Sequence, residues 1–334
     1  PKLRTDGIGL LLPDLQKMRQ IAAGLQVRFR TEIARGRFDD ALVTAKTMFA
    51  LARHMGEHPT LIGSLVGIAI AFITTGPLEE MLEQPWCPNL YWALTHLPQP
   101  LVSLEKGLEG ERVIILAELR DLDDTTPMSP EQIGKLIAYI DRLRDFDPNK
   151  EHLKTRAWLD IRVKDEKYLA AARSRLVEYG IPAERVARFP ADQVILLDER
   201  REYEARRDDE MKGLNLPTWE VEAMAAKPKP KPEPALFDLL LPVFRKVRWA
   251  QGRLEQKIAL LRHVEALRMY AAEHDGKFPQ KLEDIAVPLP SDPFSGKPFR
   301  YTLDGETAHL RGSPPNGAAD QPAFNLHYEI SIQK

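Results

Sequence analysis

Apolar and small side chains recur every three or four positions over residues 14–33, which predicts an amphipathic helix. Gly36 is expected to end this helix, because glycine readily adopts the left-handed backbone of a helix stop. Asp39 or Asp40 then caps a second helix that runs through Ala52. The two helices form a predicted αα-hairpin at the start of the chain.

The same helical periodicity continues through the first 225 residues, interrupted by proline-rich and aspartate-rich breaks. Further helices are predicted over residues 61–74, 78–83, 89–96, 101–122, 130–146, 164–179 and 192–212. Ser129, Pro130 and Gln132 give a good helix start, with proline at the first helical position. Residues 1–225 therefore predict an all-α domain, an array of antiparallel helices.

One predicted helix is free of charge: Leu61–Thr75, which is bracketed by Pro59 and Pro77. Its apolar run would extend about 22 Å as a helix, less than the roughly 30 Å of a bilayer core. We interpret it as a buried central helix. Gly63 and Gly67 form part of a small-residue face on which another helix can pack closely.

The clearest domain boundary is the segment 226–234, which reads AKPKPKPEP. Alternating prolines remove backbone donors and favour an extended chain, while the lysines keep it solvated. We interpret this segment as a semi-rigid linker.

A long helix and a small sheet are predicted beyond the linker, over residues 235–334. An apolar stripe along 236–274 repeats at steps that fit one helix face. Apolar and polar residues then alternate over 299–303 and 326–332, and Asp304–Gly305 between them suits a hairpin turn. The sequence therefore predicts a mainly α (α+β) protein whose C-terminal helix packs on a small antiparallel sheet.

Between the helix and the sheet lie residues that shape the backbone. Gly276 is expected to take a left-handed helix stop, and Pro279 prevents the helix from resuming. Asp292, Pro293 and Gly296 are expected to build a fixed turn that leads into the first strand.

This C-terminal pattern resembles the globular head of type II secretion pseudopilins. The matching residues are Leu267, Tyr270, Asp275, Gly276, Phe278, Pro279, Leu282, Ile285, Asp292, Pro293, Phe294, Gly296, Pro298 and Tyr301. Segments such as RFDDAL, NLYWALTHLPQPL and LEGERV give the chain as a whole a resemblance to a group of planctomycete-type bacterial proteins. These resemblances imply a bacterial envelope protein and no particular reaction.

Composition narrows the function classes. Among 334 residues the net charge is −2, which disfavours nucleic-acid binding. Cys87 is the single cysteine, so an intrachain disulfide is excluded. The chain begins at Pro1 rather than Met, so we expect a processed or shortened protein, and a missing N-terminal segment would allow membrane proximity.

Histidines give only a weak metal candidate. His54 and His58 stand at the i, i+4 spacing that can chelate zinc on a helix, but Gly56 and Pro59 indicate that the helix already frays there. We interpret the pair as a polar helix terminus and predict neither a metal nor a cofactor.

The segment 86–92 concentrates aromatic residues beside a thiol. Trp86, Tyr91 and Trp92 could line a groove for a ligand or peptide, or could seal the junction between two helices. Cys87 as a nucleophile would require a base such as His96 and an electropositive setting.

The sequence is rich in residues that shape the backbone, whereas no catalytic motif stands in a convincing context. We therefore expect a noncatalytic interaction or structural protein of the cell envelope, facing the periplasm, whose helical domain binds a protein partner. The alternative is a hydrolase or other enzyme with a pocket in the helical domain near His54, Trp86 and Cys87. A cytoplasmic location is the alternative to the envelope, and the oligomeric state stays open.

Overall fold

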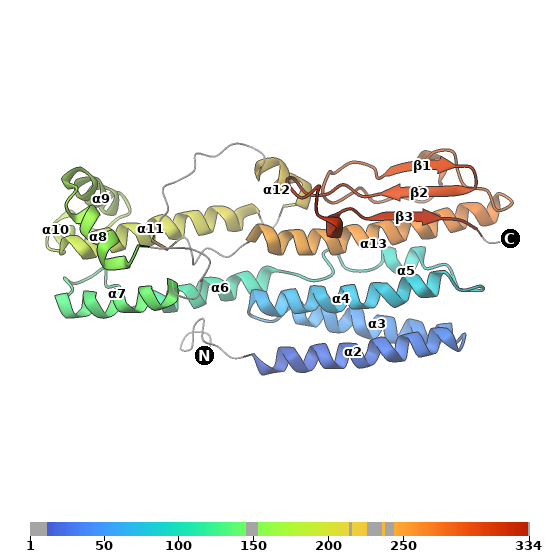
Figure 1. Ribbon diagram of the computed structural model, residues 1–334, viewed down its shortest axis with the longest axis horizontal. Helices are drawn as coiled ribbons and strands as arrows, with labels where there is room; N and C mark the ends of the chain where they lie inside the picture. Colours follow the sequence, from blue (N-terminus) through green and yellow to red (C-terminus); the bar gives the residue numbers. More distant parts are fainter. Residues whose placement is uncertain (1–11, 145–152, 214–215, 226–235, 238–243, 333–334) are drawn as a thin grey trace. The chain divides into compact units, whose positions relative to one another are not determined.

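The structure, a computed structural model, describes residues 12–144, 153–213, 216–225, 236–237 and 244–332 (Figure 1). The chain forms two compact units, each assembled from segments that are distant in the sequence. Unit 1 is formed mainly by residues 112–213, and unit 2 combines residues 11–111, 214–228 and 245–334. These boundaries differ from the consecutive division expected from the sequence. The expected linker, 226–234, lies outside the described residues.

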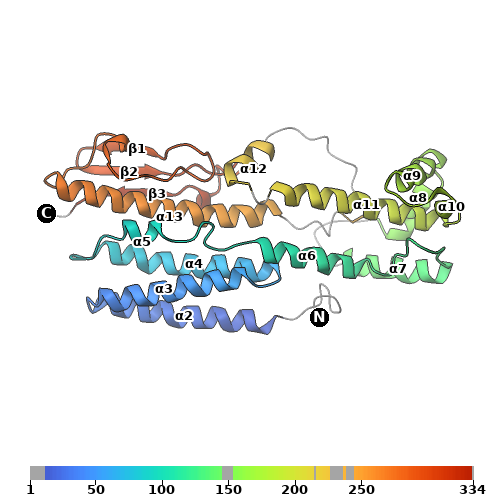
Figure 2. The same ribbon diagram turned by 180° about the vertical axis from the view of Figure 1, so that it is seen from behind.

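Unit 2 begins with three long helices that pack on one another (Figures 1 and 2). They are α2 (Pro13–Ala34), α3 (Phe38–Gly56) and α4 (Leu61–Leu82). A Cβ atom on Gly67 of α4 would lie 2.6 Å from the backbone oxygen of Ala52 in α3, so glycine permits this close approach. Asp39 and Asp40 lie in the first turn of α3 and do not cap it, since the N-cap residue is Arg37.

Helix α4 continues through Pro77, so the prediction of two helices, 61–74 and 78–83, was wrong. Proline lacks the N–H that would bond to the carbonyl four residues earlier, that of Ile73. The Gln26 side chain of α2 donates to this carbonyl instead, with Nε2 at 3.2 Å from the oxygen. Tertiary packing therefore replaces the lost hydrogen bond and allows the helix to continue.

Among the described residues, α4 is the one helix with the length and apolarity to cross a membrane. Within the structure, 67% of its most apolar window is buried. A buried core helix has the same length and composition, so this feature is weak evidence for a membrane span.

The C-terminal part of unit 2 is a long helix that packs on a three-stranded antiparallel sheet, which confirms the predicted α+β class. The elements are α13 (Phe244–Glu273), β1 (Arg300–Asp304), β2 (Thr307–Arg311) and β3 (His327–Ile330). Ala308 and Leu310 of β2 are buried against Leu260 and Leu267 of α13. The other elements of unit 2 are α5 (Tyr91–Thr95), α12 (Thr218–Ala225), η4 (Leu282–Asp284) and η5 (Pro322–Phe324).

Gly276 follows the end of α13 in the left-handed region, with φ of 76°. Its N–H donates to the carbonyl of Ala271 at 2.9 Å, a bond typical of helix stops. Three residues later, the carbonyl of Pro279 accepts a hydrogen bond of 2.7 Å from the Tyr301 hydroxyl. The turn is thereby joined to the first strand.

Asp292 is the centre of the turn that precedes β1. Its N–H donates to the carbonyl of Lys297, and its carbonyl accepts from the N–H of Gly296, both at 2.8 Å. Gly296 has φ of 66°, and Pro293 follows Asp292 directly.

Unit 1 is helical in its described residues. It contains α7 (Pro130–Arg144), α8 (Thr155–Val163), α9 (Glu166–Glu178), α10 (Ala183–Val186) and α11 (Ala191–Lys212), whereas α6 (Glu105–Glu118) has residues in both units. The predicted start of α7 is a reciprocal cap: Ser129 Oγ accepts from the N–H of Gln132, and Gln132 Oε1 accepts from the N–H of Ser129. Leu159, Leu176 and residues 194–197 form the centre of its core.

Candidate functional site

The aromatic segment 86–92 does not line a single groove. Trp86 has a left-handed backbone, with φ of 66°, and its side chain is 94% exposed. Tyr91 is fully buried, and its hydroxyl donates to the carbonyl of Pro288. Trp92 is 54% exposed and makes an edge contact with Tyr91 at 5.0 Å between ring centroids. The structure thus brings Tyr91 and Trp92 together, whereas Trp86 projects from the preceding loop.

Cys87 lies in a setting that opposes nucleophilic chemistry. Its side chain is buried, and this burial raises the pKa of the thiol, so the reactive thiolate is disfavoured. His96, the base considered above, is exposed, and its Nδ1 lies 2.7 Å from the carbonyl oxygen of Trp92.

His54 and His58 do not share a helix, because α3 ends at Gly56. His54 is exposed, and the Nδ1 of His58 lies 2.9 Å from the Oγ1 of Thr60, the N-cap residue of α4. Burial lowers the pKa of His58. His54 therefore lies in the last turn of α3 and His58 in the connection to α4, so the pair does not form a chelating face on one helix.

The acidic run 121–124 in unit 1 serves local structure. Asp123 accepts hydrogen bonds from Thr125 and Thr126, which lower the pKa of its carboxyl to about 2. Asp124 forms ion pairs with Arg200 and Arg201, both at 3.2 Å. The carboxylates of Asp123 and Asp124 therefore form a local turn and salt bridges.

Unit 2 contains a cavity of about 380 Å³ that was not predicted from the sequence. It is lined by α13, by the proline-rich segment 97–102 and by Pro290, Ser291 and Pro293. Leu94, Leu254 and Ile258 supply apolar surface, and Pro217, which precedes α12, also lines the cavity. Cavities of a few hundred Å³ with apolar walls and a few polar groups are typical ligand sites.

The charged groups of this cavity lie on one face of α13, because Arg248, Glu255 and Arg262 follow one another at intervals of seven residues. Arg248 is buried, and its Nη2 donates to the carbonyl of Leu216 at 2.8 Å. Its guanidinium lies 3.8 Å from the carboxylate of Glu255. Burial lowers the pKa of Arg248 and raises that of Glu255.

Arg262 differs from Arg248 because it has no carboxylate partner among the described residues. Its side chain is only 8% exposed, and its Nε is buried without a hydrogen bond there. The guanidinium carbon lies 5.8 Å from the centroid of the Tyr91 ring, a contact that partly compensates the charge. The cavity therefore contains two arginines and one glutamate, an excess of positive charge.

The described lining of the cavity includes one hydroxyl group, that of Ser291, and neither histidine nor cysteine. A buried arginine with free donors is suited to a carboxylate, which accepts two parallel hydrogen bonds from the guanidinium.

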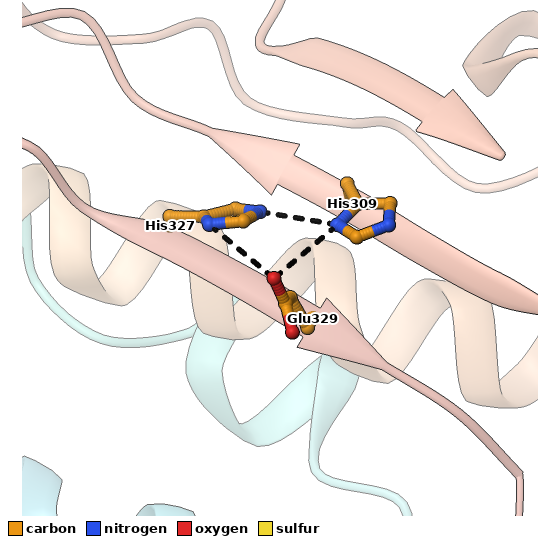
Figure 3. Close-up of side chains that lie close together, drawn as sticks. All are labelled: His309, His327 and Glu329. Atoms are coloured by element: carbon orange, nitrogen blue, oxygen red, sulfur yellow. Dashed lines mark hydrogen bonds and ion pairs between the residues drawn. The ribbon is translucent and has the colours of Figure 1, made fainter. Parts of the chain in front are cut away.

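A separate group of possible metal ligands lies on the outer face of the sheet: His309, His327 and Glu329 (Figure 3). His309 Nδ1 lies 3.2 Å from His327 Nε2, and Glu329 Oε1 lies 3.8 Å from the Nδ1 of each histidine. The cluster was not predicted from the sequence, because its residues become neighbours only through the pairing of β2 with β3. The sequence does show that His327 and Glu329 alternate with the more buried Tyr328 and Ile330. This alternation indicates that His327 and Glu329 share the outer face of β3.

Comparison with protein-family models, with curated proteins and with solved structures found no match.

Proposed function

We propose that the protein is a noncatalytic interaction protein of the bacterial cell envelope, in which unit 2 binds the C-terminal end of a protein partner. The observation that carries this proposal is the buried Arg262, which lines the cavity without a carboxylate partner in the described part of the chain.

Burying an ion away from water costs several kcal/mol, about the same order as the stability of a domain, unless an opposite charge compensates it. Arg248 has Glu255 nearby, but a single glutamate cannot neutralise two arginines. Because burial raises the pKa of Glu255, this residue is also less readily ionised. The charge balance therefore favours an anionic occupant beside Arg262.

The walls indicate what the anion is attached to. The cavity has room for more than a carboxylate, and Leu94, Leu254 and Ile258 provide apolar contacts for a neighbouring side chain. A chain end with an apolar last residue combines both features, and capture of C-terminal carboxylates is a recurring mode of peptide recognition. The occupant we propose is thus the free C-terminus of another protein.

The enzyme alternative has less support. The buried thiol of Cys87 has a raised pKa, and His54 is exposed on α3. These residues do not line the cavity, whose described lining contains no histidine that could act as a general base.

The test is peptide binding to the full chain. Fluorescent hexapeptides that end in Leu, Val or Phe would be compared as free acids and as C-terminal amides by fluorescence anisotropy. We expect the free acids to bind at least about tenfold more tightly, because a charge-assisted hydrogen bond to arginine contributes about 1.5–3 kcal/mol. Arg262→Met should abolish this preference, whereas Arg53→Met, an exposed arginine of α3, should leave it unchanged.

Three outcomes would contradict the proposal. Equal affinity for acids and amides would exclude carboxylate capture. Tight binding of hexanoate or benzoate without any preference for the peptides would indicate a small-molecule ligand. Shortened peptides in the mass spectrum after incubation would support the hydrolase alternative.

Stability provides a second, independent measurement. Replacing an arginine that supports the fold lowers the free energy of unfolding of the protein. A buried arginine without a partner instead destabilises the folded state, so its replacement does not lower that free energy. We expect Arg262→Met to leave the free energy of unfolding unchanged or to raise it by about 1–2 kcal/mol. A loss of comparable size would indicate that Arg262 supports the fold rather than a ligand.

The envelope location is supported by the resemblance of the C-terminal region to pseudopilin heads. Fractionation of bacteria that express the full-length gene should place the protein with the envelope or periplasm, and recovery in the cytoplasmic fraction alone would contradict this part of the proposal.

A further inference from the structure

The outer face of the sheet combines two histidines and a carboxylate. Strand register places His309 of β2 directly opposite Glu329 of β3. His327 lies two residues before Glu329 and therefore on the same face of β3. Figure 3 shows the three side chains grouped above the strands.

The spacing of the donor atoms is close to that of a metal site. In a tetrahedral zinc site with Zn–N distances near 2.0–2.1 Å, neighbouring donor atoms are about 3.3 Å apart. His309 Nδ1 and His327 Nε2 are 3.2 Å apart, and Glu329 Oε1 is 3.8 Å from His309 Nδ1. One donor atom from each residue can be chosen so that all three lie within 4.8 Å of one another. Small side-chain rotations would therefore complete a three-ligand set.

The chemistry of the donors selects the class of metal. Imidazole nitrogen with carboxylate oxygen is a typical donor set for zinc and neighbouring transition metals, whereas Mg²⁺ and Ca²⁺ prefer oxygen alone. The side chains of His309 and His327 are 21% and 28% exposed, so a metal ion can reach them from solvent.

Nearby charges limit the affinity. Arg311 lies opposite His327 on the same face of the sheet, and Arg300 of β1 lies opposite Arg311. Their positive charges oppose a cation, while Glu329 favours it. The group supplies three protein ligands, so a water molecule would complete a tetrahedral site.

We propose that His309, His327 and Glu329 bind a Zn²⁺ ion that links β2 to β3. Because one ligand comes from β2 and two come from β3, the ion would stabilise the pairing of these strands in unit 2. This site is separate from the α13 cavity residues, and its test does not depend on the proposed function.

The experiment uses the full chain after treatment with a chelator. ZnCl₂ alone would be titrated by isothermal calorimetry, and MgCl₂ and CaCl₂ would be titrated in parallel. We expect one Zn²⁺ per chain, no comparable heat with Mg²⁺ or Ca²⁺, and a raised melting temperature.

Variants assign the ligands. His309→Gln and His327→Gln should each weaken zinc binding about tenfold or more, because even the loss of an outer-shell partner costs 10–100-fold. Glu329→Gln should also weaken it, whereas His274→Gln, an exposed histidine after α13, should bind zinc as the wild type does. Melting of the metal-free variants would show that they are folded.

Cobalt(II) gives a readout of geometry. The wild type should show the visible absorption of four-coordinate cobalt, and His309→Gln should lose it. The proposal is overturned if zinc does not bind, if His309→Gln and His327→Gln retain wild-type affinity, or if His274→Gln removes binding equally.

Discussion

The carboxylate of Glu265 on α13 accepts a hydrogen bond from the backbone N–H of Leu90, 175 residues earlier in the chain. Arg268 pairs with Glu265 at 2.5 Å and also donates to the carbonyl of Cys87 at 3.1 Å. The Asn89 side chain donates to the backbone carbonyl of Glu265 at 2.8 Å. Residues 87–90 are thus bound to the C-terminal helix, within unit 2.

These contacts predict that cutting the chain between its N-terminal and C-terminal parts will not separate them. A specific protease site introduced within 226–234 would yield two fragments. We expect the fragments to coelute in size-exclusion chromatography under native conditions and to separate in denaturant, because residues 11–111 and 245–334 share unit 2. Separation under native conditions would instead support two consecutive, independent domains.

Much of the fold follows from local sequence signals. Helical periodicity located α2, α3, α7, α9 and α11 to within a few residues but missed α8, α10 and α12. Ser129 with Gln132 marked the start of α7 correctly. Alternation in the C-terminal segment and the Asp304–Gly305 turn predicted the sheet. These features arise from residues that are close together in the sequence, so they can be predicted from one sequence alone.

The candidate sites depend instead on distant neighbours. Arg262 is a charged residue within a helical pattern, and only the packing of segments 97–102 and 290–293 against α13 encloses it. His309 and His327 become neighbours through strand register. Continuation of α4 through Pro77 likewise depends on Gln26, 47 residues away from the carbonyl that it satisfies. Sequence periodicity carries none of this information.

Asp292 should be among the most sensitive positions of unit 2. The carboxylate is 1% exposed and accepts from the Gln256 side chain at 3.0 Å and from the N–H groups of Phe294 and Ser313 at 3.0 and 2.6 Å. Asp292→Ala would leave buried donors without an acceptor, at a cost of about 2–4 kcal/mol. Urea unfolding would measure this loss. The exposed Asp320→Ala should change stability by less than about 0.5 kcal/mol, and equal effects of the two substitutions would contradict this role.

Trp86 is predicted to contribute little to stability despite its size. Its left-handed backbone, with φ of 66°, costs a non-glycine residue about 1–2 kcal/mol, and asparagine tolerates this conformation better. Trp86→Asn should therefore leave the free energy of unfolding unchanged or raise it by up to about 1 kcal/mol. Trp92→Asn should lower it by about 0.5–1.5 kcal/mol, because the edge contact with Tyr91 is lost. Thermal unfolding would measure both, and a larger loss for Trp86→Asn than for Trp92→Asn would contradict the prediction.

Glu199 of unit 1 should make stability depend on pH. It is buried and accepts hydrogen bonds from the N–H of Leu236 at 2.8 Å and from the Tyr168 hydroxyl at 2.9 Å. Burial raises its pKa above the value of about 4.3 in an unfolded chain, so the folded state binds the proton more tightly. Its stabilising contribution is therefore complete below about pH 4.3 and is lost as the pH rises through the raised pKa.

Glu199→Gln tests this sign, because glutamine remains neutral at every pH and keeps an acceptor oxygen for one of the two donors. The free energy of unfolding of the variant minus that of the wild type should increase as the pH rises above about 4.3. Urea unfolding followed by circular dichroism at several pH values would measure the difference. Glu178→Gln, at an exposed position of α9, is the matched control for the same change of side chain. If the Glu199→Gln difference does not vary with pH or changes in the opposite direction, burial does not control the ionisation of Glu199.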